Sequence, residues 1–243
     1  MDILFKTFID HFSANLQLSE NTIAEICNHL SILNLDKKHV LIKENQRHDF
    51  AYFVVKGAVR SYYLKDGVEV NTWFALENDM VGSLHNFKDN PSRETIELIE
   101  NSTLISINLK HVKPLMFSNI QIANFINAII EDYALFLEEK IYFSQMMSSI
   151  DKYLILLDKE PQLIQRIPLT YIASFLGISR ETLSRLRAKW FCDNCQMISF
   201  LSNAILQSKN DNKDECNRSK QQTFVYRPCK RFGSIFYDCC SHT

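Results

Sequence analysis

Residues 167–189 (I-P-L-T-Y-I-A-S-F-L-G-I-S-R-E-T-L-S-R-L-R-A-K) constrain the fold of this chain more than any other segment. Apolar residues spaced i, i+3, i+4 and i+7 predict one face of a first helix: Leu169, Ile172, Ala173 and Leu176. Gly177 permits a sharp turn because glycine adopts positive φ at little cost. Ser179 is then a natural N-cap for a second helix. The segment therefore predicts a helix-turn-helix.

The second helix is expected to turn its apolar side chains inward and its polar ones outward. The inward set is Leu183, Leu186 and Trp190, and the outward set is Arg180, Glu181, Ser184, Arg185 and Arg187. Arginine can pair bidentately with guanine, and glutamate can accept from the amino group of cytosine. The segment therefore indicates DNA reading in the major groove. An ordinary helical hairpin with a solvated charged face is the alternative.

The charge of the chain is distributed unevenly along its 243 residues, a length for one large or two modest domains. Residues 1–143 hold 13 basic and 19 acidic residues, a net charge of −6. Residues 144–190 hold 7 basic and 4 acidic residues, a net charge of +3. An acidic body with a basic C-terminal module fits a sensor that carries a nucleic-acid reader.

The first 190 residues are typical of a reduced, cytoplasmic protein. They contain a single cysteine, Cys27. No run of about 18 consecutive apolar residues indicates a membrane span. The amphipathic N-terminus, M-D-I-L-F-K-T-F-I-D-H-F, does not have the charged and apolar regions of a signal peptide.

The N-terminal half changes from a helical to an extended pattern. Residues 2–35 are expected to be helical, because apolar residues recur at helical spacing. Short runs rich in Val, Ile, Tyr and Phe then predict strands over 51–55, 59–64, 68–74, 95–99 and 103–107. Asp66 and Gly67 supply a hairpin turn. These short, evenly spaced strands suggest a compact antiparallel barrel or roll.

A long helix follows, with an apolar seam that suggests a dimer. The seam residues step by 4, 3, 4 and 3: Ile122, Ile126, Ile129, Tyr133 and Phe136. They indicate a dimerisation helix, since helix-turn-helix readers usually dock as two-fold dimers. A helix packed on its own roll is the alternative. Residues 149–157 predict a further helix before the reader.

With this order of segments the sequence resembles the Crp/Fnr family of bacterial transcription regulators. It is similar to the variant of the family found in the Bacteroidetes. The resemblance covers about residues 10–190 and is most specific in A-S-F-L-G-I-S-R-E-T-L-S-R at 173–185. It is weaker in V-V-K-G-A-V-R at 54–60 and N-D-M-V-G-S at 78–83. It implies an α+β fold, in which a cyclic-nucleotide-binding-like antiparallel β-roll precedes a dimerisation helix and a winged-helix reader.

The resemblance also implies partners and DNA contacts. The partners are double-stranded DNA, a second copy of the chain and RNA polymerase. Base edges would be contacted by Arg180, Glu181 and Arg185, and Ser179 would help to hold phosphate. Contacts to the DNA phosphate backbone position the helix without carrying sequence information. They would come from Thr170, Ser184, Arg187 and Lys189.

For an effector, the resemblance points to Gly82, Ser83 and Arg93. Nucleotide-binding members have Gly-Glu at the first place, whereas this chain has Ser83 after Gly82. Arg93 is followed by Glu94, an acidic neighbour that would weaken a phosphate cradle. These departures argue against a cyclic nucleotide, and the sequence identifies no cofactor.

The chain is expected to contain four segments. They are an effector domain over 1–115, a dimerisation helix over 116–143, a reader over 144–190 and an atypical tail over 191–243. The tail holds six of the seven cysteines: Cys192, Cys195, Cys216, Cys229, Cys239 and Cys240. A zinc site at the C-x2-C spacing is one interpretation. A disordered or non-homologous extension is the favoured one, and no metal site is predicted.

Two other functions compete with a DNA-binding regulator. One is a ligand-binding or protein-interaction sensor whose reader is inactive. The other is a metal enzyme of the cupin type, which needs several histidines and a carboxylate at strand spacing. The histidines of this chain are isolated: His39, His48, His85 and His111. The sequence therefore predicts no catalytic residues and no enzyme.

Overall fold

The computed structural model describes residues 1–188, apart from the side chains of residues 144 and 146. Lys189, Trp190 and the tail predicted over 191–243 lie outside the described residues. The chain divides into one unit from Met1 to Gly177 and a second unit that begins at Ile178.

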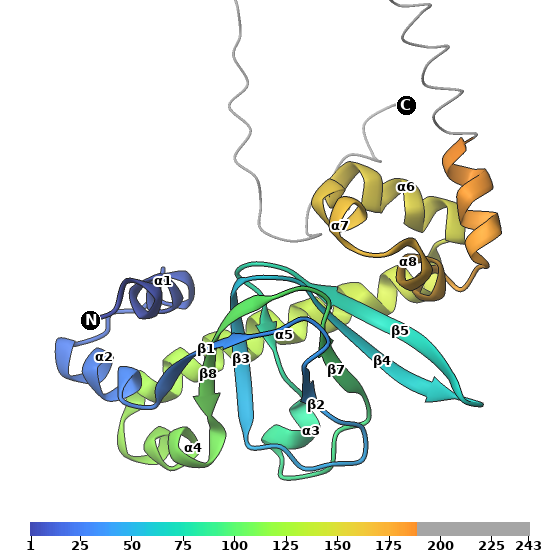
Figure 1. The fold of residues 1–243 in the computed structure, drawn as a ribbon. Helices are drawn as coiled ribbons and strands as arrows, with labels where there is room; N and C mark the ends of the chain where they lie inside the picture. Colours follow the sequence, from blue (N-terminus) through green and yellow to red (C-terminus); the bar gives the residue numbers. More distant parts are fainter. Residues whose placement is uncertain (189–243) are drawn as a thin grey trace, which may run out of the picture. The chain divides into compact units, whose positions relative to one another are not determined.

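Two four-stranded antiparallel sheets build a β-roll in the first unit (Figure 1). Their strand orders are β1-β8-β3-β6 and β2-β7-β4-β5. The strands are β1 (Leu30–Leu35), β2 (Val40–Ile42), β3 (Phe50–Lys56), β4 (Val59–Lys65), β5 (Val68–Ala75), β6 (Met80–Val81), β7 (Thr95–Leu98) and β8 (Ser102–Asn108). The predicted antiparallel roll is therefore confirmed.

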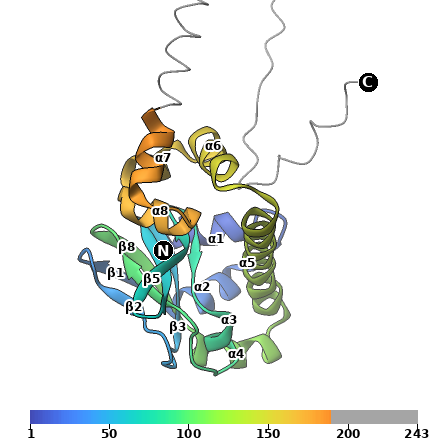
Figure 2. The same ribbon diagram turned by 90° about the vertical axis from the view of Figure 1, so that its right-hand side faces the viewer.

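Helices flank the roll and follow it (Figures 1 and 2). They are α1 (Ile3–Phe12), α2 (Glu20–Cys27), α3 (Leu84–Phe87), α4 (Leu109–Ser118), α5 (Ile120–Met146), α6 (Ser149–Lys159), α7 (Pro161–Arg166) and α8 (Leu169–Leu176). The helix expected over 149–157 is α6, and the first helix of the predicted helix-turn-helix is α8. Pro114 lies inside α4, and the long helix begins at Ile120, where the Asn119 side chain accepts from the backbone.

Two apolar cores lie on opposite faces of the sheet that contains β3 and β8. Val54 and Leu104 belong to a core shared with the second sheet. Their neighbours Phe53 and Ile105 belong to a core with helices α1, α4 and α5. This division follows from the alternation of side chains along a strand.

The predicted dimerisation seam lies against the roll of its own chain. Ile122 is fully buried, and Ile126, Ile129 and Tyr133 are at most 9% exposed. Ile122, Ile126 and Ile129 pack in the same core as Phe53. The seam assignment was therefore wrong for these residues, because the roll offers an apolar surface that covers the same stripe.

The helical prediction over residues 2–35 was wrong at its end. Residues Leu30–Leu35 form β1, which pairs with β8 from Leu30↔Ile107 to Leu35↔Ser102. This pairing joins segments about seventy residues apart. The spacing of apolar residues within a short segment does not indicate which distant strand it pairs with. Here the pairing of β1 with β8 overrides the helix propensity of residues 30–35.

Candidate functional site

The second unit begins with a capped helix over residues 180–188. Ser179 precedes it, and its Oγ accepts a hydrogen bond of 3.1 Å from the Thr182 N–H. The Ser179 carbonyl accepts from the Leu183 N–H at 3.0 Å. Before it, Gly177 has φ of +69°, which is the left-handed conformation that favours glycine. The predicted turn residue and N-cap are both confirmed.

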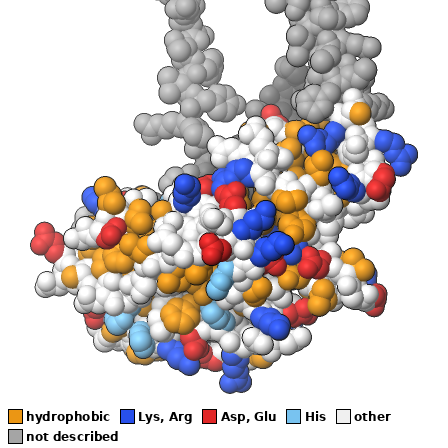
Figure 3. Space-filling view, viewed as in Figure 1, with side chains coloured by type: hydrophobic (Ala, Val, Ile, Leu, Met, Phe, Trp, Pro, Cys, Tyr) orange, Lys and Arg blue, Asp and Glu red, His pale blue; other side chains and the backbone are white. Residues whose placement is uncertain are grey.

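The first turns of this helix present charged side chains of both signs to solvent (Figure 3). Arg180, Glu181, Ser184 and Arg185 are exposed, and Arg187 is partly exposed. Neither Arg180 nor Arg185 forms an ion pair with another described residue. The Arg185 Nε donates only to the Glu181 carbonyl, at 3.4 Å.

Glu181 is held in its charged form. A hydrogen bond from its own backbone N–H lowers the pKa of Glu181, and the Ser179 hydroxyl acts in the same direction. Arg180 and Arg185 lower this pKa further. The helix start therefore combines two guanidinium donors and one carboxylate acceptor, which is the chemistry needed to read base edges.

The residues predicted to contact the DNA phosphate backbone are divided between the two units. Thr170 is exposed in the first turn of α8, and Ser184 and Arg187 belong to the second unit. Lys189 lies outside the described residues.

Two of the three predicted effector residues line an apolar pocket. Gly82 and Ser83 join β6 to α3 at its wall, and the Tyr133 hydroxyl donates to the Gly82 carbonyl at 3.3 Å. The remaining wall comes from β3, β6, β8, α3, α4 and α5 and is largely apolar: Ala51, Met80, Val81, Leu84, Phe87, Ile107, Leu109, Val112, Lys113, Ile126, Ile129 and Ile130. Arg93 is exposed and does not line it, so the structure does not bring the three residues together.

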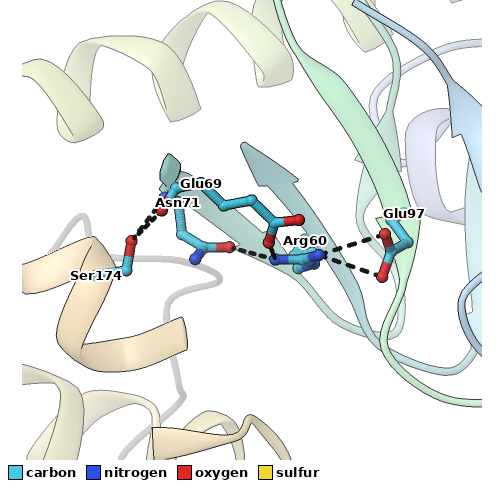
Figure 4. A network of polar contacts seen from close by, with 5 residues as sticks. All are labelled: Arg60, Glu69, Asn71, Glu97 and Ser174. Carbon is cyan, nitrogen blue, oxygen red and sulfur yellow. Dashed lines mark hydrogen bonds and ion pairs between the residues drawn. The ribbon is translucent and has the colours of Figure 1, made fainter. Parts of the chain in front are cut away.

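A buried arginine in the roll was missed by sequence reasoning (Figure 4). Arg60 on β4 has a side chain that is 3% exposed. Its Nη1 lies 2.6 Å from Glu69 Oε2 and 3.5 Å from Asn71 Oδ1. Its Nη2 lies 3.3 Å from both carboxylate oxygens of Glu97. Burial favours its neutral form, but the bonds to Glu69 and Glu97 outweigh this, so the pKa of Arg60 is raised.

The same cluster joins the roll to α8. The Arg60 guanidinium lies 4.0 Å from the centre of the Tyr171 ring. The Ser174 hydroxyl donates to the Glu69 carbonyl at 3.0 Å and accepts from the Asn71 N–H at 3.1 Å. In this way α8 binds the edge strand β5. No local signal marked the contacts with α8, because Ser174 lies more than a hundred positions from Glu69 and Asn71.

A second arginine joins α7 to the roll. Arg166 donates to both carboxylate oxygens of Glu77, at 2.7 and 2.9 Å, and to Glu100. Burial raises the pKa of Glu77, but Arg166 and the Gly57 N–H lower it more, to about 2. The segment before the second unit is thus fixed to the roll at two places.

Within the described residues, one helix has the composition of a membrane span, and no metal-binding cluster is found. One helix, α5 between Ile120 and Phe143, is long and apolar enough in composition to cross a membrane, and its buried stripe packs on the roll. The described residues hold no group of three or more metal-ligating side chains.

Comparisons with known proteins identify the roll and the fold. Residues 32–119 match the family model of the cyclic nucleotide-binding domain. FixK2 from Bradyrhizobium japonicum is 21% identical, with a TM-score of 0.58, over 68% of this chain and 86% of that one. CLP from Xanthomonas campestris, a c-di-GMP responsive global regulator, is 18% identical, with a TM-score of 0.57, over 72% and 93%.

A further solved structure has the same fold. A regulator of the crp/fnr family from Eubacterium rectale is 20% identical, with a TM-score of 0.55, over 72% of this chain and 85% of that one. A search of curated proteins finds no significant match.

Proposed function

We propose that this chain, which carries a cyclic nucleotide-binding domain and resembles the Crp/Fnr regulators in fold, is a sequence-specific DNA-binding transcription regulator. It acts in the cytoplasm as a homodimer and has no enzymatic activity. Its roll senses an input, and the helix over 180–188 reads DNA as the second helix of a winged helix-turn-helix. RNA polymerase is a further partner.

The guanidinium groups of Arg180 and Arg185 carry this proposal, because both side chains are exposed and form no ion pair with any residue of the described part of the chain. They stand at the start of a helix beside an ionised Glu181. In the major groove, each arginine would pair with guanine and Glu181 would accept from cytosine. Positioning contacts to phosphate would come from Ser179, Thr170, Ser184, Arg187 and Lys189.

The solvent-exposed outer face of α5 supports a dimer. Leu135 and Ile141 are 61% and 58% exposed, and Tyr142 is 38% exposed. Leu135 and Tyr142 are seven residues apart, as are Ala134 and Ile141, which is the repeat of a helix pair. We therefore place the dimer contact on this outer face instead of on the buried seam. A two-fold dimer would read two half-sites in successive major grooves.

Signal transfer would pass through the contacts of α7 and α8 with the roll. Arg166 and Ser174 fix these helices to strands and loops of the sensor. An input that favours another arrangement of the roll would shift the population of reader positions. The apolar pocket beside α3 suits a small apolar molecule better than a nucleotide, since nearly all of its lining surface is apolar.

Selection of bound sequences from random duplexes tests the proposal. The full chain should enrich a palindromic motif, and Arg185→Ala should lose preference at one base pair of each half-site. Arg47→Ala, which removes an exposed arginine of the roll, is the matched control and should keep the motif. No enrichment by a folded protein would favour a sensor with an inactive reader. Leu135→Glu should yield monomers in sedimentation, whereas Leu154→Glu on α6 should not.

A further inference from the structure

The carboxylate of Glu94 lies at the meeting point of two strands of the roll. Its Oε2 accepts a hydrogen bond from the Ser61 hydroxyl on β4. On β5, the Trp73 Nε1 donates to the same oxygen at 3.1 Å, and the Thr72 hydroxyl is also 3.1 Å away. Ser61 is fully buried and Trp73 is 3% exposed. The Ser61 hydroxyl, the Thr72 hydroxyl and the Trp73 N–H therefore converge on one carboxylate oxygen, and the single hydroxyl hydrogen of Thr72 is shared with Ser61 Oγ, 3.0 Å away.

A bulge in β5 creates this convergence. Ser61 pairs with Trp73, but Tyr62 pairs with Asn71, so Thr72 is an extra residue in the ladder. An extra residue redirects side chains that would otherwise alternate between faces. Thr72 and Trp73, although adjacent, both reach Glu94.

The turn before Glu94 fixes its direction. The Ser92 side chain, 1% exposed, donates to the Glu94 carbonyl at 2.8 Å and accepts from the Glu94 N–H at 3.2 Å. The Ser92 backbone bonds to Asn45 and Gln46. Arg93, between them, is exposed. The turn thus sends the acidic side chain toward the roll and the basic one toward solvent.

A cation from α5 faces the same place. The Lys140 Nζ lies 5.5 Å from the centre of the Trp73 ring. Burial lowers the pKa of Lys140 to about 8, while the charge of Glu94 acts in the opposite direction. Burial also raises the pKa of Tyr133, and Glu94 adds to that rise. The charge of Glu94 thus acts on two ionisable groups of α5, Lys140 and Tyr133.

We propose that Ser61, Thr72 and Trp73 form an anion site that the chain's own Glu94 occupies, which closes the roll to the carboxylate or phosphate group of a ligand. Hydrogen bonds to a charged acceptor are stronger than those to a neutral one, so the internal carboxylate is held firmly. An external anion would bind only after Glu94 has left. This inference does not depend on the proposed DNA binding.

Replacement of Glu94 by alanine tests the site, because it removes a methylene and a carboxylate, which together have the size of acetate. Glu94→Ala should lower the midpoint of thermal unfolding by about 5–10 °C, since buried donors lose their acceptor. Acetate should restore at least half of this loss in a saturable way, relative to chloride at equal ionic strength. The Glu94→Ala, Thr72→Val double variant should bind acetate more weakly.

The controls distinguish specific binding of acetate at this site from non-specific stabilisation by salt. The wild type and Glu131→Ala, which removes an exposed acid on α5, should show no acetate dependence. Inorganic phosphate and cyclic AMP should not stabilise the wild type. Saturable stabilisation of the wild type by either one would overturn the claim that Glu94 closes the site.

Two further results would contradict the anion site itself. A folded Glu94→Ala protein with an unchanged midpoint, or with no response to acetate, would do so. If that variant does not fold, Glu94→Gln keeps an acceptor oxygen but removes the charge, and it should also lower the midpoint. A Glu94→Gln protein as stable as the wild type would refute the need for an anion.

Discussion

Two arginines of this chain, Arg60 in the roll and Arg185 on the helix over 180–188, are opposites in their surroundings. Arg60 is 2% exposed and has carboxylate partners on two other strands. Arg185 is exposed, and within residues 1–188 its side chain donates only to a backbone carbonyl of its own helix. A buried guanidinium must find its partners within the fold, whereas an exposed one keeps its donors for another molecule. Pairing therefore separates the arginine that stabilises the roll from the arginine that we propose for base recognition.

Of these changes, Arg60→Met should cause the largest loss in the free energy of unfolding. The change leaves Glu69 and Glu97 without their cation, and breaking a buried pair typically costs about 3–5 kcal/mol. Urea unfolding of the full chain measures this loss. Arg47→Met, at an exposed site, should stay within about 0.5 kcal/mol of the wild type. An equal effect of the two changes would remove the contrast between buried and exposed arginines.

Arg185→Ala should show the reverse pattern. We expect unchanged urea unfolding but a loss of about 1–3 kcal/mol in discrimination at one base pair. Competition binding with single-base variants of the selected site measures this. An Arg185→Ala protein with the wild-type site preference would contradict its role in base reading.

Arg166 has an intermediate exposure, with a side chain that is 25% exposed. Its ion pair with Glu77 should make the stability of the fold depend on pH. The folded pKa of Glu77, about 2, lies below that of an unfolded glutamate. Its stabilisation is therefore complete above about pH 5 and is lost as the pH falls toward 2. Glu77→Gln should remove about 1–2 kcal/mol of this acid-dependent stability, after allowance for solvent screening. Acid unfolding curves that are parallel in variant and wild type would contradict the assignment.

Lys189→Ala should have the smallest effect, a modest loss of DNA affinity. A lysine contact to phosphate carries no base information, so affinity should fall by a similar factor for all sequences. The slope of log affinity against log salt should decrease by about one. Titrations of specific and random duplexes at several salt concentrations measure it, and a sequence-dependent loss would place Lys189 at a base edge instead.

Local signals in the sequence were sufficient for the segment around the reader. The helical spacing of α8, the left-handed Gly177 and the cap at Ser179 all depend on residues within one or two turns of each other. The antiparallel roll was also predictable, because short strands with turn residues between them identify the fold class. The proposed function rests on exposed side chains of that locally specified helix.

Only the tertiary structure decided which face each side chain occupies. The stripe of Ile122, Ile126 and Ile129 fits a dimer or a roll equally well by spacing, and the roll covers it. Glu94 and Arg93 are adjacent in sequence, yet a turn and a bulge fixed elsewhere send the acid inward and the base outward. A sequence determines its local helices and caps because their partners are near. The direction of a strand residue depends on partners far along the chain, so the assembled fold determines it.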